Sequence, residues 1–158
     1  MVEEWQNNIE SKPKLRLYKE LKQEFTVESY VIRNIPKNIR SIFAQFRIGI
    51  LPLHIETGRF VNIVDSQTGR YRKTNVEERL CKLCNSQEVE DEKHFIFECN
   101  LYRDERHKLH ELCSDLPEFT NYSEIDKLKY FNKYEWRFLA NYIYEIWQKR
   151  KGSEYLVI

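Results

Sequence analysis

Apolar residues recur at helical spacing in the first third of the chain. Ser11, Lys12 and Pro13 suit the start of a helix, because proline is tolerated in the first turn. The apolar residues that follow at every fourth position are Leu17, Leu21 and Phe25. A shorter helix is expected over residues 26–33. Pro36 then starts a third helix, whose apolar stripe consists of Ile39, Ile42, Phe43 and Phe46.

The last third of the chain shows the same period. A helix is expected over residues 100–113, and Ser123 is a suitable N-cap for a short one. The final helix has the longest apolar stripe, which consists of Trp136, Leu139, Ala140, Ile143, Ile146 and Trp147. Basic residues 149–151 followed by Gly152 predict its end.

The middle of the chain lacks this period. Residues 49–80 combine short apolar runs with glycine and proline, which is typical of loops and short strands. Residues 94–98 are rich in β-formers and predict one strand. The sequence therefore predicts a mainly α fold in a single domain over residues 1–158. Its parts are a helical N-terminal part (1–48), a loop and metal-binding part (49–106) and C-terminal helices (107–158).

Composition and charge narrow the class of protein. An apolar share of 41% in 158 residues is enough for a hydrophobic core, and four glycines and four prolines exclude a collagen-like chain. With no span-length apolar run and no signal peptide, we expect an intracellular protein, nuclear or cytoplasmic, that is not secreted and binds no membrane. Residues 12–48 carry nine basic and three acidic side chains, whereas residues 83–126 carry four and twelve. This asymmetry indicates either an anionic partner or an ordinary surface of mixed charge.

The spacing of cysteine and histidine predicts a metal site. Cys81, Cys84, His94 and Cys99 follow the pattern C-x2-C-x9-H-x4-C, and without a secretory signal disulfides are not expected. Three thiolates and one imidazole fill a tetrahedral zinc site and leave no open position, which is typical of a structural ion. We therefore expect one structural Zn²⁺ in a small zinc-stabilised β/loop insert, knuckle- or treble-clef-like, within a helical domain.

Other interpretations of these side chains stay open at this point. Cys81 and Cys84 can form a redox pair, although no βαβ pattern surrounds them, and all four residues can be ordinary core residues. A second cluster, His107, His110 and Cys113, recurs every third residue on one predicted helix, where the three side chains do not converge easily. We interpret these as two surface histidines and a small buried cysteine.

Residues 79–106 resemble a known family. They contain a Cys-x-x-Cys pair, an acidic stretch that ends in His94, an apolar segment, Cys99 and a later arginine, Arg106. This order resembles the C-terminal zinc-binding (CCHC) region of non-LTR (LINE-type) retrotransposon reverse transcriptases. The segment upstream, with Arg47-x-Gly49 and Leu53-x-Ile55-Glu56-x-Gly58-Arg59-Phe60, and the basic end of the final helix are also similar to that region.

The resemblance implies that Cys81, Cys84, His94 and Cys99 hold zinc and that the module contacts RNA or DNA. The spacing between Cys84 and His94 is longer than in the short retroviral-type knuckle. These residues contain no polymerase Asp-Asp motif and no endonuclease or RNase H carboxylate cluster. The resemblance therefore implies a fragment, a solo copy or a captured domain that performs no catalysis of its own.

A nucleic-acid-binding module is the first function that the sequence indicates. Basic side chains would contact phosphates and an aromatic ring would stack on an unpaired base. The candidate contacts are Lys37, Arg40, Arg47, Arg59, Arg70, Tyr71, Arg72 and Lys73. Each of them can also be an ordinary solvated residue.

The alternative is an exapted, zinc-stabilised protein–protein interaction or adaptor domain without nucleic-acid binding. The aromatic share of 14% and the acidic segment indicate it, and the apolar tail over residues 155–158 can dock on a partner or fray. An enzyme is a third class. His54, Glu56 and Asp65 resemble an acid/base set, but no nucleophile or open metal site accompanies them, so we expect no catalysis.

Overall fold

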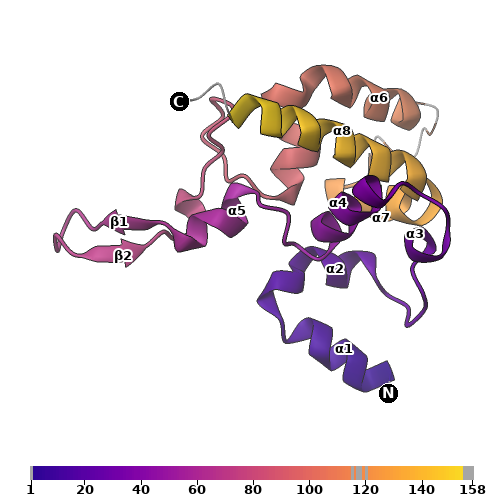
Figure 1. Ribbon diagram of the computed structural model, residues 1–158, viewed down its shortest axis with the longest axis horizontal. Coiled ribbons are helices and arrows are strands. Elements are labelled where there is room, and N and C mark those ends of the chain that lie inside the picture. The colour runs from indigo at the N-terminus through magenta and orange to yellow at the C-terminus, as the bar shows by residue number, and fades with distance from the viewer. Residues whose placement is uncertain (1, 115, 117–118, 120, 155–158) are drawn as a thin grey trace.

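Helices form most of the structure, a computed structural model that describes residues 2–114, 116, 119 and 121–154. Figure 1 shows the longer helices packed together, with a two-stranded hairpin projecting on the opposite side from α7 and α3. This architecture confirms the predicted mainly α fold with a small β insert. The tail over residues 155–158 lies outside the described residues. Among the helices of the described part, none combines the length and apolarity that crossing a membrane requires.

The N-terminal helices follow the predicted pattern, except that the first predicted helix is shorter than expected. Phe25 is expected in this helix but lies beyond its end, because the backbone of Lys22 is extended and ends the helix at Leu21. Phe25 is half exposed and its ring lies 5.5 Å from that of Trp5. The N-terminal helix has too few apolar residues to be predicted. The elements are α1 (Val2–Glu10), η1 (Pro13–Leu15), α2 (Arg16–Leu21), α3 (Ser29–Ile32) and α4 (Lys37–Arg47).

The C-terminal helices are η5 (Asn100–Tyr102), α6 (Arg103–Ser114), α7 (Glu124–Tyr134) and α8 (Trp136–Glu154). Ser123 is the N-cap of α7, as predicted, since its Oγ accepts a hydrogen bond from the Asp126 N–H at 3.2 Å. The predicted end of the final helix at Gly152 is wrong. This glycine keeps a helical backbone inside α8 instead of the left-handed conformation that ends a helix.

The hydrophobic core surrounds α8, which packs against α4, α6 and α7. Because α8 is buried along its predicted stripe, it determines where the other elements meet. The largest apolar side chains with almost no exposure are Phe43, Phe46, Leu51, Leu53, Phe95, Ile96, Tyr102, Phe131, Leu139, Ile143 and Ile146.

The middle of the chain forms short elements, as predicted. They are α5 (His54–Thr57), η2 (Gly58–Phe60), β1 (Asn62–Val64), β2 (Tyr71–Lys73), η3 (Val76–Glu78) and η4 (His94–Glu98). The two strands pair antiparallel. The predicted strand over residues 94–98 is wrong, because this segment is a single π-helical turn. Its β-forming residues are buried in the core, and burial favours the same apolar residues in a strand or in a turn.

Candidate metal centre

Four side chains converge between the loop over residues 81–84 and the turn η4. The ligand atoms of Cys81, Cys84, His94 and Cys99 all lie within 4.8 Å of one another. Cys81 Sγ is 4.0 Å from Cys99 Sγ, and Cys84 Sγ is 3.4 Å from His94 Nε2. Tetrahedral zinc, with bonds of about 2.3 Å to sulfur and about 2.05 Å to nitrogen, places two sulfurs about 3.8 Å apart and sulfur and nitrogen about 3.6 Å apart. The group is therefore suited to one metal ion, and its donors are those of a structural zinc site.

A short antiparallel bridge presents the first two ligands. Leu80 pairs with Val89, and the Cys81 N–H donates a hydrogen bond to the Glu88 carbonyl at 2.7 Å. The chain reverses direction between these residues, and Gln87 takes a positive φ of 61° in the turn. Cys81 and Cys84 therefore lie on one tight loop, which allows both thiols to reach the same point.

The other two ligands lie at the ends of η4. The His94 N–H donates to Asp91 Oδ1 at 2.8 Å and starts the turn, and the Cys99 N–H donates to the His94 carbonyl at 2.8 Å. This bond spans five residues instead of the four of an α-helix. The wider turn lets residues 94 and 99 meet at the metal group while Phe95 and Ile96 enter the core.

Two side chains from the C-terminal helices donate hydrogen bonds to backbone carbonyls of this turn. The Tyr142 hydroxyl of α8 donates to the Ile96 carbonyl at 2.9 Å. Arg106 of α6 donates to the same carbonyl at 3.4 Å and also to the carbonyl of Cys99. Arg106 is the late arginine of the motif, so its contact with a ligand residue accounts for its place in the pattern. Sequence analysis does not find Tyr142, because its partner lies 46 residues away.

Contacts within the metal group shift the pKa values of three of its side chains. The Cys81–Cys99 contact lowers the pKa of Cys81 and raises the pKa of Cys99, because the two sulfurs share one proton. Burial lowers the pKa of the His94 imidazole, but the contacts with Cys81 and Cys84 outweigh burial and raise this pKa to about 9. A metal ion that binds here replaces these protons and holds the thiolates and the neutral imidazole.

Glu98 lies beside the other nitrogen of the histidine ligand. His94 Nδ1 is buried and is 3.6 Å from Glu98 Oε2. A metal-bound imidazole commonly directs its second N–H toward a carboxylate. Glu98 therefore favours the tautomer that leaves Nε2 for the ion. A smaller group of Glu88, His94 and Glu98 also lies within ligand distance, and it shares His94 with the four-residue group.

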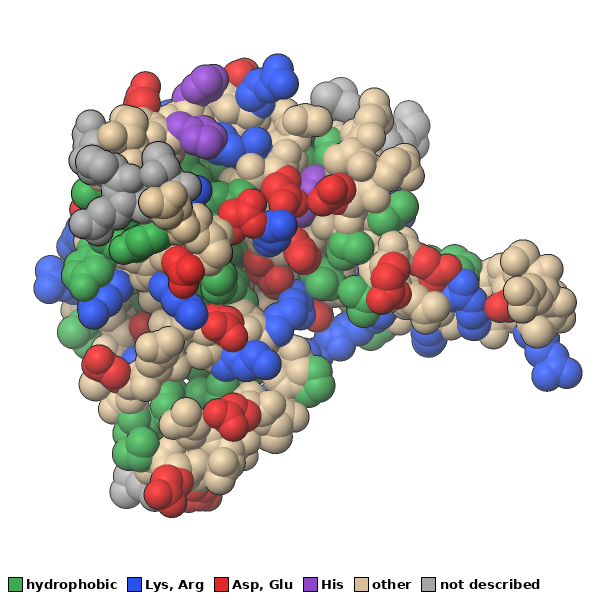
Figure 2. Space-filling model, turned by 180° about the vertical axis from the view of Figure 1, so that it is seen from behind, with side chains coloured by type: hydrophobic (Ala, Val, Ile, Leu, Met, Phe, Trp, Pro, Cys, Tyr) green, Lys and Arg blue, Asp and Glu red, His purple; other side chains and the backbone are tan. Residues whose placement is uncertain are grey.

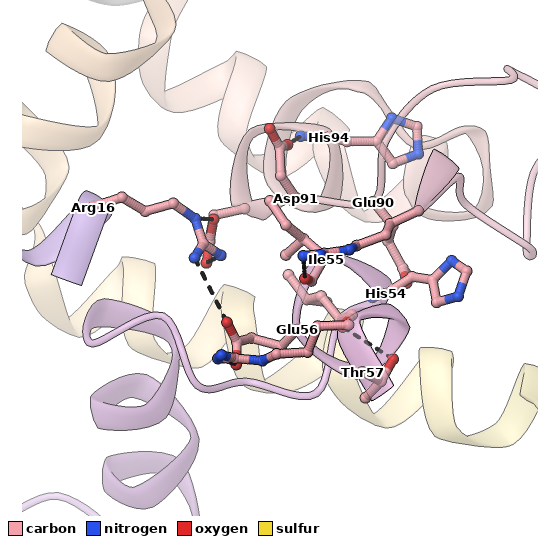
Figure 3. Close-up of polar contacts among 12 residues, drawn as sticks. Arg16, His54, Ile55, Glu56, Thr57, Glu90, Asp91 and His94 are labelled. Carbon is pink, nitrogen blue, oxygen red and sulfur yellow. Dashed lines mark hydrogen bonds and ion pairs between the residues drawn. The ribbon is translucent and has the colours of Figure 1, made fainter. Parts of the chain in front are cut away.

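The segment over residues 80–90 carries the first two ligands, and we call it the metal loop. Glu90 connects this loop to two helices. Its buried carboxylate accepts two hydrogen bonds of 2.8 Å from Arg150 of α8 and one of 2.7 Å from the His54 N–H at the start of α5. The Glu90 carbonyl accepts a further bond from the Ile55 N–H at 3.1 Å, and Figure 3 shows these residues together. Arg150 is 5% exposed and lies over the Trp147 ring. The pair is shielded from water, so each charge depends on the other.

The short elements α5 and η2 pack directly on the metal loop. His54 Nδ1 lies 2.7 Å from the Leu80 carbonyl, next to the first ligand, and Arg79 donates to the Ile55 carbonyl at 2.8 Å. A Cβ atom on Gly58 would lie 2.7 Å from Arg79 Cγ, which is closer than real contacts allow. A side chain at position 58 would therefore force Arg79 to move. Two residues of the upstream segment, Ile55 and Gly58, thus contact Arg79 beside the first ligands.

Glu56 and Asp65, two of the residues considered as an acid/base set, form hydrogen bonds with different partners. Glu56 accepts a hydrogen bond from Arg59 at 2.6 Å. Asp65 Oδ1 accepts bonds from the N–H groups of Thr68 and Gln67, and these bonds lower the pKa of this exposed carboxyl. These contacts favour structural roles for the set.

The second histidine and cysteine cluster does not converge. His107 and His110 are exposed on α6, and Cys113 is half buried against the core, where burial raises the pKa of its thiol. Within the described part of the chain, none of the three belongs to a group of possible metal ligands. This agrees with their interpretation as two surface histidines and a packing cysteine.

The prediction that Arg47 contacts nucleic acid is wrong. Its side chain is 1% exposed and its Nη1 lies 2.7 Å from Glu28 Oε2. The guanidinium also lies over the rings of Tyr18, Tyr30 and Phe43, at 5.6, 5.1 and 5.8 Å from their centres. Such a stack is a cation–π site inside the N-terminal core and cannot reach a phosphate.

The other predicted contacts fall into two groups. Arg59 bonds to Glu56 at 2.6 Å and Arg72 bonds to Glu78 at 2.7 Å, so the chain itself already neutralises these charges. Tyr71 is 79% exposed. Figure 2 shows the projecting hairpin with basic side chains along one edge and at its end. Of the predicted basic contacts, those that form no ion pair with any residue the structure describes are Lys37, Arg40, Arg70 and Lys73.

Comparisons with models of protein families, with curated proteins and with solved structures find no match to this chain.

Proposed function

We propose that this chain is a non-catalytic module in which one structural zinc ion supports an RNA- or DNA-binding surface. The observation that carries the proposal is the hairpin arm, which we define as residues 61–74. It projects from the body and presents basic and aromatic side chains to solvent. Its second strand continues through η3 to Arg79, which contacts α5 and directly precedes the metal loop. Zinc would therefore fix the base of the arm.

A structural role for the ion follows from its ligands. Three thiolates and one imidazole fill the tetrahedron, so no position is left for a substrate or an activated water. Zinc binding of this kind contributes directly to folding free energy. The ion would hold the loop over residues 81–84 against η4, and through Glu90 it would hold both against α5 and α8.

We also propose a relationship to the C-terminal zinc-binding region of LINE-type reverse transcriptases, as a solo or captured domain. Two residues of the resembling pattern have structural roles that support this. Gly58 permits the close contact with Arg79, and Arg106 bonds to the carbonyl of the ligand Cys99. Since these roles serve the fold and not a polymerase, a domain separated from its enzyme would retain them.

A protein-interaction module is the second candidate, favoured by one specific observation. The segment over residues 25–32 exposes apolar side chains, among them Val27 at 67%, Val31 at 51% and Ile32 at 69%. A group of exposed apolar side chains commonly marks an interaction site. In this case zinc would hold the same fold, and the arm would have no nucleic-acid ligand.

The test is binding of the zinc-loaded chain to labelled structured RNA, single-stranded DNA and duplex DNA, followed by fluorescence anisotropy at about 50 and about 200 mM salt. We expect binding that weakens at the higher salt. A Lys37→Ala and Lys73→Ala double variant should bind more weakly, with a smaller salt dependence. Lys133→Ala, an exposed lysine on α7, is the control and should bind as the wild type does. Zinc-loaded, folded protein that binds none of the three would contradict the proposal and favour the interaction module.

A further inference from the structure

The hairpin arm has two unlike faces. Val64 pairs with Tyr71 and Asn62 pairs with Lys73, and alternate residues of a strand share a face, so these four side chains lie on one side. All four are exposed, with Tyr71 at 79% and Val64 at 57%. We call this the open face.

Backbone bonds on either side of the strands define how its side chains meet. The Asp65 N–H donates to the Arg70 carbonyl at 2.8 Å, and the Thr74 N–H donates to the Val61 carbonyl at 3.2 Å. Since hydrogen-bonded and non-hydrogen-bonded pairs alternate, Val64 and Tyr71 form a non-hydrogen-bonded pair. Side chains of such pairs approach most closely, so the aromatic ring of Tyr71 lies beside an apolar neighbour.

On the opposite face of the arm, the side chains are partly covered and one of them bonds to other residues of the chain. Ile63 and Arg72 are only half exposed, and Arg72 bonds to Glu78 at 2.7 Å and lies 3.4 Å from Asp65. Arg72 is therefore a positioning residue, which ties the strands to η3, and not a partner contact. Because neighbouring residues of a strand point to opposite faces, the open face points away from the side on which Arg72 bonds to η3.

Charge on the arm favours an anionic ligand. Arg70 and Lys73 form no ion pair with any part of the chain that the structure describes, whereas the neighbouring acid Asp65 is bonded within its own turn. An exposed aromatic ring beside free cations is the combination on which a base stacks while its phosphate is neutralised. A base inside a duplex is covered on both sides by its neighbours, so only an unpaired or terminal base can stack on a side chain.

We propose that the open face of the arm binds an unpaired nucleotide, with the base stacked on Tyr71 and the phosphate paired with Lys73. The proposal rests on the proposed nucleic-acid binding and adds the state of the strand that is bound. Val64 supports the edge of the ring, and Asn62 supplies an amide donor and acceptor next to the ammonium group.

The experiment measures fluorescence anisotropy of labelled oligouridine and oligothymidine, each of about 12 nucleotides, and of a DNA duplex of about 40 base pairs, in which nearly all bases are covered on both sides, with the zinc-loaded full chain. The variants are Tyr71→Ala, Tyr71→Phe and Tyr134→Ala, the last removing a 59% exposed tyrosine from α7 as a matched control. Circular dichroism and zinc content verify that each variant is folded. The affinity of Tyr71→Ala for single strands should fall by about 5- to 150-fold. Tyr71→Phe and Tyr134→Ala should retain it, and duplex binding should not respond to Tyr71→Ala.

The outcomes separate this inference from the proposed function. If the wild-type chain binds no nucleic acid, both fail. If it binds and Tyr71→Ala holds single strands as tightly as the wild type, the inference about the open face is wrong and nucleic-acid binding stands. A Tyr71→Ala variant that loses duplex and single-strand binding equally would also contradict stacking on an unpaired base.

Discussion

Glu90 and Arg150 form a doubly hydrogen-bonded ion pair that joins the metal loop to the last helix, with both side chains almost fully buried. Glu90 precedes the histidine ligand by four residues, and Arg150 lies near the end of α8. The C-terminal helix therefore takes part in forming the metal site, although it supplies no ligand.

Removal of one partner of this pair should destabilise the chain strongly. Glu90→Gln leaves the Arg150 charge buried without its counter-charge, which typically costs about 3–5 kcal/mol. The free energy of unfolding from urea titration of the zinc-loaded protein measures it. The matched control is Lys108→Ala, which breaks the exposed pair with Glu145 and should cost less than about 1 kcal/mol. Equal losses in the two variants would show that burial of the Glu90–Arg150 pair has no energetic effect.

Zinc content should follow the four proposed ligands alone. Cys84→Ser removes a thiolate and should lose most of the bound zinc, with faster hydrogen exchange over residues 79–100, because binding of a structural ion is part of the folding free energy. His107→Ala, His110→Ala and Cys113→Ser should keep the zinc content of the wild type. A chromogenic chelator measures the metal released from denatured protein. Full zinc content in Cys84→Ser would mean that Cys84 is not a ligand.

Two glycines should respond to substitution in opposite directions. Gly58→Ala places a Cβ atom 2.7 Å from Arg79 Cγ and should lower stability by about 1–3 kcal/mol, because close overpacking forces neighbours to move. Gly152→Ala meets no atom within 4 Å in the helix α8 and should raise stability by about 0.5 kcal/mol. Thermal unfolding of both variants compares them directly. A stabilised Gly58→Ala would exclude the tight contact between η2 and the residue before the metal loop.

Arg47→Ala should destabilise the N-terminal part and leave nucleic-acid binding per folded molecule unchanged. The substitution removes the guanidinium between Tyr18 and Tyr30 and leaves Glu28 with its weaker 3.4 Å contact to Lys22. A loss of about 3 kcal/mol is expected for breaking a buried ion pair. Denaturation gives the stability, and anisotropy below the unfolding transition gives the affinity. Weaker binding by fully folded Arg47→Ala would restore this arginine as a contact.

The Arg72–Glu78 pair should survive to low pH. Bonds from the Arg72 guanidinium and then from the Asn75 N–H lower the pKa of Glu78 from 4.5 to about 2. Because the folded pKa lies below the unfolded one, the stabilising contribution of this carboxylate is complete above its unfolded pKa and is lost as the pH falls toward 2. Carbon-13 NMR titration of the carboxyl group measures it. Arg72→Ala should raise the midpoint and Arg70→Ala should not, whereas an unshifted wild-type midpoint would contradict the pairing.

Periodicity in the sequence predicts the features that depend on residues close together along the chain. The stripes of α4 and α8 and the cap at Ser123 depend on neighbouring residues, and the structure confirms all three. The metal group is also predictable, because three cysteines and a histidine at suitable spacing have few other uses in one short segment.

Contacts between distant segments are not predictable in this way. The position of Arg47 on α4 resembles that of a solvated residue, and only the rings that α2 and α3 supply make it a core residue. The apolar run over residues 94–98 reads equally well as a strand, since the wide turn depends on a metal group and on Tyr142, 46 residues away from its partner. The Glu90–Arg150 pair spans 60 residues and leaves no local pattern.

The wide turn of η4 has an optical consequence. Its geometry points Phe95 into the core, where the ring packs against Phe46, Tyr102 and Trp147, the last with ring centres 6.4 Å apart. In an ordinary α-helix, two residues five positions apart are rotated by about 140° relative to each other, so ligands and core ring keep their places only in the wider turn. Release of the proposed ion would remove the constraint that holds residues 94 and 99 together, and the surroundings of the Trp147 indole, which packs against Phe95, would change with it. The chain would thus contain its own fluorescent reporter of metal occupancy.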